Sequence, residues 1–258
     1  MNAMHTNYHT HTFRCHHAFG TEREYIEKAI EAGFTVLGFS DHTPQFYRTD
    51  YYNKNKMRPE ELQGYVETIL SLKEEYRGRI EIPLGLEVEY YPAIFDRLLT
   101  FLKDYPIEYF ILGQHYIGSD EKIYSGAPTG DKKILFDYVA QVKEALSTGR
   151  FSCLAHPDLI NYTGDAASYY SAMKDLCRTC RDLGIPVELN LHGLEGHRNY
   201  PNTLFFRIAA EEGLSVILGS DAHLPEEVYK EQVAREAMQM AKLCGCHVID
   251  TLTLRPPL

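Results

Sequence analysis

Histidines stand along this chain at spacings that suit a metal-binding site. The chain of 258 residues contains 12 of them. His9 and His11 follow a short apolar run, and side chains at i and i+2 of an extended segment point to the same side. Neutral imidazoles placed in this way are suitable ligands for a divalent metal ion. One such pair is weak evidence by itself, so the positions of the other potential ligands decide its meaning.

The other potential ligands also follow apolar runs. Runs rich in Val, Ile, Leu, Phe and Tyr predict eight strands, at 4–9, 35–40, 80–88, 108–114, 151–155, 186–190, 215–220 and 247–254. Six of the first seven end in a histidine or a carboxylate: His9 and His11, Asp41 and His42, Glu87, His115, His156, and Asp221 with His223. Unrelated core or surface histidines would not all fall between an apolar run and a helix. The pattern therefore indicates one shared site.

Helical segments separate the predicted strands and define a repeated unit. Thr21 and Glu24 form a capping-box pattern at the start of the first helix. A repeat of strand, helix and strand predicts parallel strands with crossover helices. Its length fits a closed barrel, in which the strand ends share one face, or an open doubly wound sheet. Glycines stand between a helix and the next strand at Gly149, Gly184 and Gly213.

Composition narrows the class of protein. The formal net charge of -10 and the absence of a Lys/Arg run argue against nucleic acid as the main partner. No run approaches the roughly 20 apolar residues of a membrane span, so we expect a cytoplasmic protein. The six cysteines are too scattered for a disulfide framework, and Cys177 and Cys180 are interpreted as neighbours on a helix. With no linker-like segment, residues 1–258 are expected to form a single domain.

Seven motifs resemble, in matching order from about residue 7 to 224, those of the PHP (polymerase and histidinol phosphatase) family of metal-dependent phosphoesterases, and within it the histidinol-phosphatase branch. The resemblance implies an α/β fold, a distorted (β/α)7 TIM-like barrel, which spacing alone does not select. The motifs are His9-Thr10-His11, His16-His17-Ala18, Phe39 to His42, Gly85 to Glu87, Gly113 to His115, Ala155 to Asp158 and Gly219 to His223.

The resemblance also implies about three divalent metal ions, which are zinc, iron or manganese because sites of this kind accept all three. His16 is the alternative to its neighbour His17. Three dications and two carboxylates leave a charge of about +4, which would attract a small phosphate ester. The implied ligands are His9, His11, Glu87 and Asp221 for one ion, Glu87 with His115 and His156 for a second, and His17, His42 and His223 for a third.

The implied reaction is hydrolysis of a small phosphate monoester, L-histidinol phosphate, to L-histidinol and phosphate in histidine biosynthesis. A hydroxide bridging two metal ions would attack phosphorus in line with the ester oxygen. The catalytic residues would be Asp221, His223 and Glu87. Asp41 and Asp158 would either fix imidazole tautomers or cap helices, and the sequence favours neither role over the other.

Arg198 is the predicted phosphate contact, with His197 and Tyr200 beside it, because a guanidinium fork suits a phosphate group. The connections at 43–57 and 117–131 are long enough to predict lids over the substrate.

Other readings remain open from the sequence. Many histidinol phosphatases carry a basic residue shortly after His-Pro-Asp, whereas residues 159–163 are neutral here, so a nucleotide or sugar phosphate is the alternative substrate. Glu89 or Asp50 would have to bind the amine of histidinol phosphate. An amidohydrolase usually has a metal-bridging lysine after its fourth strand, where this chain has His115. A non-enzymatic PHP module often lacks ligands that this chain retains. The oligomeric state is not predicted.

Overall fold

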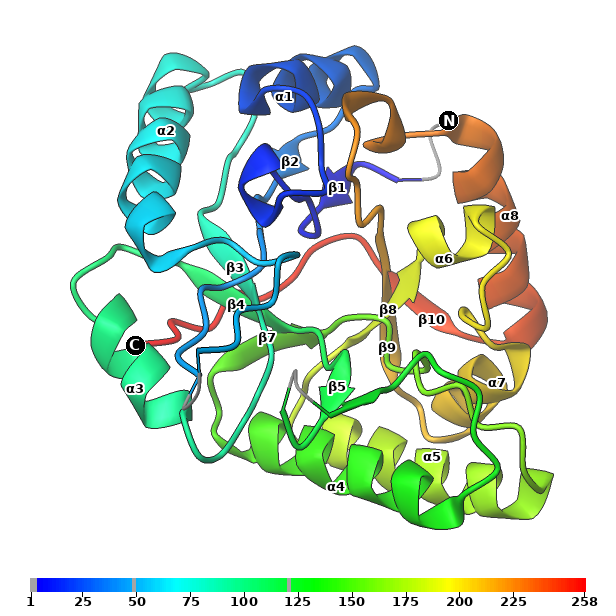
Figure 1. Ribbon diagram of the computed structural model, residues 1–258. Helices are drawn as coiled ribbons and strands as arrows, with labels where there is room; N and C mark the ends of the chain where they lie inside the picture. Colours follow the sequence, from blue (N-terminus) through cyan, green and yellow to red (C-terminus); the bar gives the residue numbers. More distant parts are fainter. Residues whose placement is uncertain (1–3, 48–49, 120–121) are drawn as a thin grey trace.

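The strands of the molecule lie at its centre and the helices surround them (Figure 1). The computed structural model describes residues 4–47, 50–119 and 122–258. One parallel sheet has the order β10-β9-β8-β7-β4-β3, and β1 pairs with β2 in a second parallel sheet. The strands are β1 (Thr6–Asn7), β2 (Val36–Leu37), β3 (Gly85–Val88), β4 (Tyr109–Leu112), β7 (Phe151–Leu154), β8 (Val187–Asn190), β9 (Ser215–Gly219) and β10 (His247–Ile249).

Isolated bridges join the two sheets into a ring. The chain around β2 runs parallel to β3, through bridges of Val36 to Glu81, Phe39 to Leu84 and His42 to Glu87. On the other side, Thr10 bridges to Ala222 after β9, and the N–H of His11 donates to the Ala222 carbonyl at 3.0 Å. Within the described residues, β1, β2, β3, β4, β7, β8 and β9 thus form a distorted seven-stranded barrel, as the resemblance implied.

β10 is an eighth parallel strand that lies outside this ring. It pairs with the first residues of β9, and the Thr6 hydroxyl donates to the carbonyl of Asp250 just beyond it. The chain then crosses the end of the barrel where the strands begin, and Leu252 packs there against the inner residues.

Most helices follow a strand and cover the outside of the barrel. Thr21 and Glu24 form the predicted capping box at the start of α1. Cys177 and Cys180 are buried on α5 in the hydrophobic core, as interpreted from the sequence. No described helix is long and apolar enough to cross a membrane. The helices are α1 (Glu22–Glu31), α2 (Leu62–Glu75), α3 (Phe95–Leu102), α4 (Lys132–Ser147), α5 (Ala166–Asp182), α6 (Leu191–Glu195), α7 (Thr203–Glu211) and α8 (Glu231–Cys244).

An antiparallel hairpin of β5 (Tyr116–Ile117) and β6 (Ile123–Tyr124) was not predicted. Short 3₁₀ turns also occur in three connections, at η1 (Phe13–Cys15), η2 (Pro59–Glu61) and η3 (Pro225–Glu227).

Alternation along the strands separates an outer core from a barrel interior. Phe110 and Leu112 of β4 belong to the large cluster that includes helix residues, whereas Tyr109 and Ile111 belong to a small inner cluster. Tyr109 is fully buried, and its hydroxyl donates to the Tyr8 carbonyl at 2.8 Å. The same alternation turns Glu87 of β3 and Glu188 of β8 inward. The interior is therefore apolar at one end and polar at the other.

Replacing Gly38 or Gly85 with alanine should destabilise the fold. A Cβ at either position would overlap the Tyr109 side chain inside the barrel. Overpacking a filled core typically costs about 1–3 kcal/mol, so the urea midpoint of the metal-free protein should fall.

Gly64→Ala is the matched control, because Gly64 lies in α2 with open space around its missing Cβ. Alanine is the better helix former by about 1 kcal/mol, so this variant should be at least as stable as the wild type. Equal stability of all three variants would contradict the packing described for Tyr109.

Candidate metal centre

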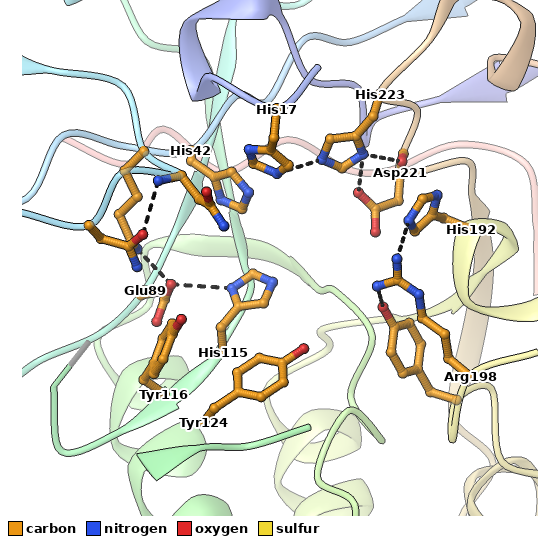
Figure 2. A pocket seen from close by; sticks show the side chains of 14 residues that line it. His17, His42, Glu89, His115, Tyr116, Tyr124, His192, Arg198, Asp221 and His223 are labelled. Carbon is orange, nitrogen blue, oxygen red and sulfur yellow. Dashed lines mark hydrogen bonds and ion pairs between the residues drawn. The ribbon is translucent and has the colours of Figure 1, made fainter. Parts of the chain in front are cut away.

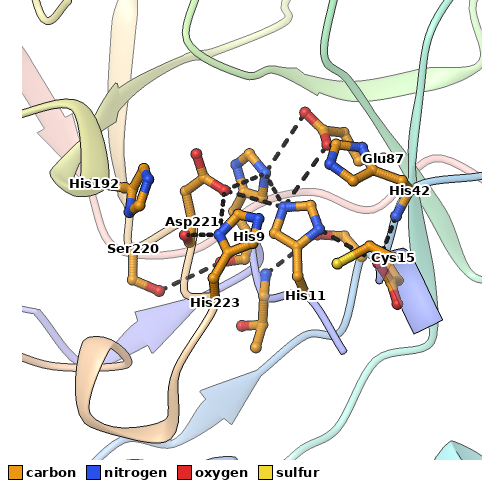
Figure 3. A network of polar contacts seen from close by, with 12 residues as sticks. His9, His11, Cys15, His42, Glu87, His192, Ser220, Asp221 and His223 are labelled. Carbon is orange, nitrogen blue, oxygen red and sulfur yellow. Dashed lines mark hydrogen bonds and ion pairs between the residues drawn. The ribbon is translucent and has the colours of Figure 1, made fainter. Parts of the chain in front are cut away.

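The nine side chains predicted as metal ligands converge at the carboxyl ends of the barrel strands. Figures 2 and 3 label all of them except His156. Glu87 lies within β3, and the others follow a strand or the η1 turn. The backbone turns sharply at two of them, because His156 and Asp221 have positive φ values of 28° and 51°. Both residues come two positions after the last residue of a strand, β7 or β9, where the chain leaves the sheet and the side chain enters the site. The strands predicted at 151–155 and 215–220 run one residue beyond the observed ones.

His9, His11 and Asp221 form the first group of possible ligands. Asp221 Oδ1 lies 3.0 Å from His11 Nε2 and 3.4 Å from His9 Nε2, and the two Nε2 atoms are 3.2 Å apart. Metal–nitrogen distances near 2.0–2.1 Å in a tetrahedral shell place neighbouring ligand atoms about 3.3 Å apart. These three atoms thus have the separation of ligands around one metal ion, and a cation between them would relieve the close approach of two ring nitrogens.

Glu87 connects this group to a second one. Its Oε1 lies 3.0 Å from His156 Nε2 and 3.8 Å from His115 Nε2, and 3.6 Å from His9 Nε2 of the first group. Its Oε2 lies 2.7 Å from His42 Nδ1 but is buried without a hydrogen bond. A buried carboxylate oxygen that accepts no hydrogen bond is costly unless a cation is near. Glu87 therefore fits the bridging role that the resemblance implies.

His17, His42 and His223 form the third group, with ring nitrogens within 4.8 Å of one another. The Nδ1–H groups of His17 and His223 donate to backbone carbonyls at 2.8 and 2.9 Å. Their Nε2 atoms, 3.0 Å apart, are therefore left to bind a metal ion. His16 instead lies outside the cluster, with its Nε2 3.1 Å from Glu61. The geometry thus places His17, and not His16, among the possible ligands.

The buried carboxylates and histidines shift one another's pKa values. Burial would lower the pKa values of His9 and His11, but the neighbouring carboxylates raise both well above their usual value. Burial alone would raise the pKa of Glu87, but His42, His115 and His9 hold that pKa well below its usual value. His9 and His11 do the same to the pKa of Asp221 against the effect of burial. Burial lowers the pKa of His42 to about 3. At neutral pH the carboxylates are therefore ionised and His42 is neutral.

The two aspartates that were predicted as tautomer-fixing groups or helix caps differ in position. Asp41 Oδ1 lies 3.4 Å from His11 Nδ1 and accepts the His42 N–H at 2.8 Å, so Asp41 supports the ligands and caps no helix. Asp158 contacts no histidine ring and accepts the N–H of Asn202, the residue that caps α7. Its burial raises its pKa to about 7. The tautomer role therefore does not apply to Asp158.

Glu188 was missed by the sequence analysis. His9 Nδ1 donates to its Oε1 at 2.7 Å, and the backbone N–H of His156 donates to its Oε2 at 2.9 Å. The signal was present, because alternation in the run at 186–190 turns a glutamate at its centre inward. A prediction based on strand ends does not reach a residue at the centre of a strand.

A cavity of about 480 Å³ opens above the ligand cluster. Arg198 and Tyr200 line it, and the guanidinium donates to the Tyr200 hydroxyl at 3.1 Å. Arg198 also lies 2.7 Å from His192 Nε2, and His192 lines the cavity as well. His197 is exposed and does not line it. The structure therefore brings two of the three predicted substrate contacts to the cavity, together with His192.

Both long connections contribute to the cavity wall. The 43–57 segment supplies Asn53, Asn55 and Lys56, and the β5–β6 hairpin supplies Tyr116 and Tyr124 (Figure 2). Residues 48–49 and 120–121 of these two predicted lids lie outside the described residues. The described parts form the sides of the cavity. Whether these segments close over a bound substrate stays a prediction.

Glu89 lies in this wall as part of a buried ion pair. Lys56 Nζ lies 2.6 Å from Glu89 Oε1, and His115 Nδ1 lies 3.2 Å from the same oxygen. Burial would raise the pKa of Glu89, but Lys56 and His115 lower it to about 2. Asp50 is exposed and does not line the cavity. Asp41, Glu188 and Glu89 are also buried near these residues, so the charge of bound cations would be offset further than the predicted balance of about +4 allowed.

Fold and site together define an α/β barrel with a cluster of metal-binding residue types at the carboxyl ends of its strands. The PHP domain model matches residues 7–192. A probable histidinol-phosphatase of Deinococcus radiodurans is 32% identical over 231 residues, which cover 85% of this chain and 86% of that protein. The histidinol-phosphatase of Bacillus subtilis is 34% identical over 118 residues, or 43% of this chain and 44% of that one. This chain therefore belongs to the PHP domain family and to its histidinol-phosphatase-like branch.

Solved structures share the fold. The histidinol phosphate phosphatase of Lactococcus lactis, complexed with zinc, L-histidinol and phosphate, has a TM-score of 0.73 at 18% identity, covering 95% of both chains. A histidinol phosphatase structure from Listeria monocytogenes has a TM-score of 0.72 at 19% identity, covering 87% of this chain and 97% of that one. At these identities the likeness shows the fold alone, and it agrees with the distorted barrel.

Replacing His17 should cost the protein a metal ion, whereas replacing its neighbour should not. His17→Ala removes one of the ring nitrogens of the third group, so after reconstitution the variant should hold about one ion fewer per chain than the wild type. His16→Ala is the control, because among the acidic groups of the described residues His16 contacts only Glu61. Elemental analysis of both variants after gel filtration measures this, and a loss in His16→Ala alone would reverse the assignment.

Proposed function

We propose that this protein hydrolyses L-histidinol phosphate to L-histidinol and inorganic phosphate, a step of histidine biosynthesis, in the cytoplasm. The observation that carries the proposal is the set of ligand-type atoms spaced 3.0–3.4 Å apart below a cavity that also holds a guanidinium. The relative from Deinococcus radiodurans, a probable histidinol-phosphatase, supports the choice of substrate.

We propose that about three divalent ions bind the cluster, in the three ligand groups described above. When bound, they would supply Lewis-acid charge to the phosphoryl oxygens and lower the pKa of a water molecule. Zinc accompanies the related Lactococcus lactis protein, and zinc is the metal we propose to test first.

The residues of the chain then have separate tasks. Arg198 binds the phosphate dianion through charge-assisted hydrogen bonds, and His192 and Tyr200 hold its guanidinium toward the cavity. Asp221 accepts a proton from the attacking water, and that proton later passes to the alcohol oxygen that leaves phosphorus. Glu87 and His223 would hold metal ions, which would supply positive charge to the phosphate.

A second candidate is hydrolysis of another small phosphate, such as a nucleotide or a sugar phosphate. The observation that favours it is the ion pair between Glu89 and Lys56, which already engages the buried carboxylate that would receive the substrate amine. Lys56 also brings a positive charge to the cavity wall, where the neutral residues 159–163 bring none.

Phosphate release from a substrate panel separates the two candidates. Zinc-reconstituted protein should act on L-histidinol phosphate with a kcat/KM at least about tenfold above that for nucleoside monophosphates and sugar phosphates, a difference of about 1.4 kcal/mol. Asp221→Asn and His9→Ala should abolish turnover of every substrate while the circular dichroism spectrum remains native. Equal or faster release from nucleotides would exclude the histidinol phosphate proposal, and an active Asp221→Asn would exclude the cluster.

Arg198→Ala should weaken the use of substrate without removing the metal ions. A charge-assisted hydrogen bond contributes about 1.5–3 kcal/mol, so kcat/KM should fall roughly 10- to 150-fold, mostly through a higher KM. Tyr200→Phe removes only the hydroxyl that orients the guanidinium and should have a smaller effect.

Arg235→Ala is the control, since Arg235 is exposed on α8 and, within the part of the chain that the structure describes, forms its ion pair with Glu231 of its own helix. An unchanged KM for Arg198→Ala, or an equal change in Arg235→Ala, would remove Arg198 from the phosphate site.

A further inference from the structure

β8 supplies none of the nine proposed metal ligands, yet it directs two polar side chains into the barrel. Glu188 and Asn190 are both buried, with 3% and 1% of their surface exposed. Alternation places them on the inner face, and the apolar residues between and beside them face the helices. A buried carboxylate and a buried amide in a strand need a full set of partners, and those partners indicate what the pair does.

Glu188 accepts three hydrogen bonds from two proposed ligands and from Asn190. The Nδ1–H of His9 donates to Oε1 at 2.7 Å. The backbone N–H of His156 and the side-chain amide of Asn190 both donate to Oε2, each at 2.9 Å. With its Nδ1–H donated to Glu188, a neutral His9 would present the lone pair of Nε2 toward Asp221 and His11, where a metal ion can take it.

Asn190 extends the same network in two directions. Its Nδ2 also donates to Asp221 Oδ2 at 3.1 Å, so one amide group separates the carboxylates of Glu188 and Asp221. Its Oδ1 accepts the N–H of Gly193 at 2.8 Å and caps α6, which precedes Arg198. The orientation of the amide is fixed, since its nitrogen faces two carboxylates and its oxygen faces an N–H.

The geometry points to Glu188 and Asn190 as positioning residues that hold His9, His156 and Asp221 in the arrangement that binds metal ions. This inference rests on the metal-binding part of the proposed function and not on its substrate. The carboxylate sets the tautomer of His9 and anchors the backbone of His156. The amide turns Asp221 toward His9 and His11 and links the cluster to the segment that carries the phosphate-binding guanidinium.

A carboxylate is required at position 188 because all three neighbours are donors. Glutamine has the same size but only one acceptor oxygen. If its oxygen faces His9, its NH₂ group meets the N–H of His156 and the NH₂ of Asn190. If its NH₂ group faces His9, the imidazole must carry its proton on Nε2, which then cannot bind a metal ion. Glu188→Gln therefore changes the hydrogen-bonding pattern with almost no change in volume.

Space for this carboxylate comes from the next strand. A Cβ on Gly219 of β9 would overlap Glu188 Oε1 and its carboxyl carbon. Gly219 has no positive φ that would demand glycine, so its missing side chain is explained by the close approach of Glu188.

The test measures zinc binding by the whole chain, by titration of chelator-treated protein against a competing chromophoric chelator. Glu188→Gln should bind zinc at its weakened site roughly 10- to 100-fold less tightly than the wild type. Glu67→Gln is the control, because Glu67 is exposed on α2, and its zinc affinity should not change. A folded Glu188→Gln that binds the wild-type number of ions with unchanged affinity would overturn the inference, whatever its activity.

Asn190→Ala provides an independent test if Glu188→Gln does not fold without metal. It removes the donor to Asp221 and the cap of α6 but leaves the bond between Glu188 and His9. We expect a loss of zinc affinity smaller than that of Glu188→Gln, together with a higher KM. Unchanged affinity in this variant would contradict the positioning role.

The outcome of the substrate assay is independent of the zinc-binding test. If the wild type binds zinc and Glu188→Gln weakens that binding, the inference stands even where histidinol phosphate is not hydrolysed.

Discussion

The burial of five carboxylates at one end of the barrel is the constraint on which the rest of the structure depends. An isolated buried carboxylate is costly, so each must find hydrogen bonds or positive charge nearby. Imidazoles surround most of them, and Lys56 pairs with one. The separations of the ligand atoms indicate that cations complete this balance. The five are Asp41, Glu87, Glu89, Glu188 and Asp221.

The barrel accommodates this cluster through small residues and through strained backbone. Gly113 directly follows β4, beside Glu87, and Gly219 ends β9, beside Glu188, and a side chain at either glycine would overlap the neighbouring carboxylate. His156 and Asp221 have positive φ values, which cost of order 1–3 kcal/mol each in residues other than glycine. Such strain persists where the surrounding contacts hold it, and here it turns two ligand-type side chains into the cluster. The backbone strain at these two residues thus lowers the stability of the fold but gives the site its geometry.

The connections that follow the strands form the wall of the cavity above the cluster. The guanidinium of Arg198, the Lys56–Glu89 ion pair and the tyrosines of the β5–β6 hairpin surround a cavity whose floor is the cluster. By our proposal, metal ions held by the cluster would attract a phosphate-like anion through their charge, and this wall would contact the organic group attached to it. This division explains why the reaction class follows more readily from the sequence than the substrate does.

The sequence by itself determined the parallel strands, the capped helices and the convergence of ligand types, because period-two alternation and strand-end position are local properties of the chain. Only the tertiary structure decided that His17 lies beside His42 and His223 while His16 lies beside Glu61, because the direction of the backbone after η1 separates these adjacent residues. It also decided which inward residues support the ligands, as with Glu188, and it paired Glu89 with Lys56 from a distant connection. These contacts join residues far apart in the chain, and no local pattern records which of them meet.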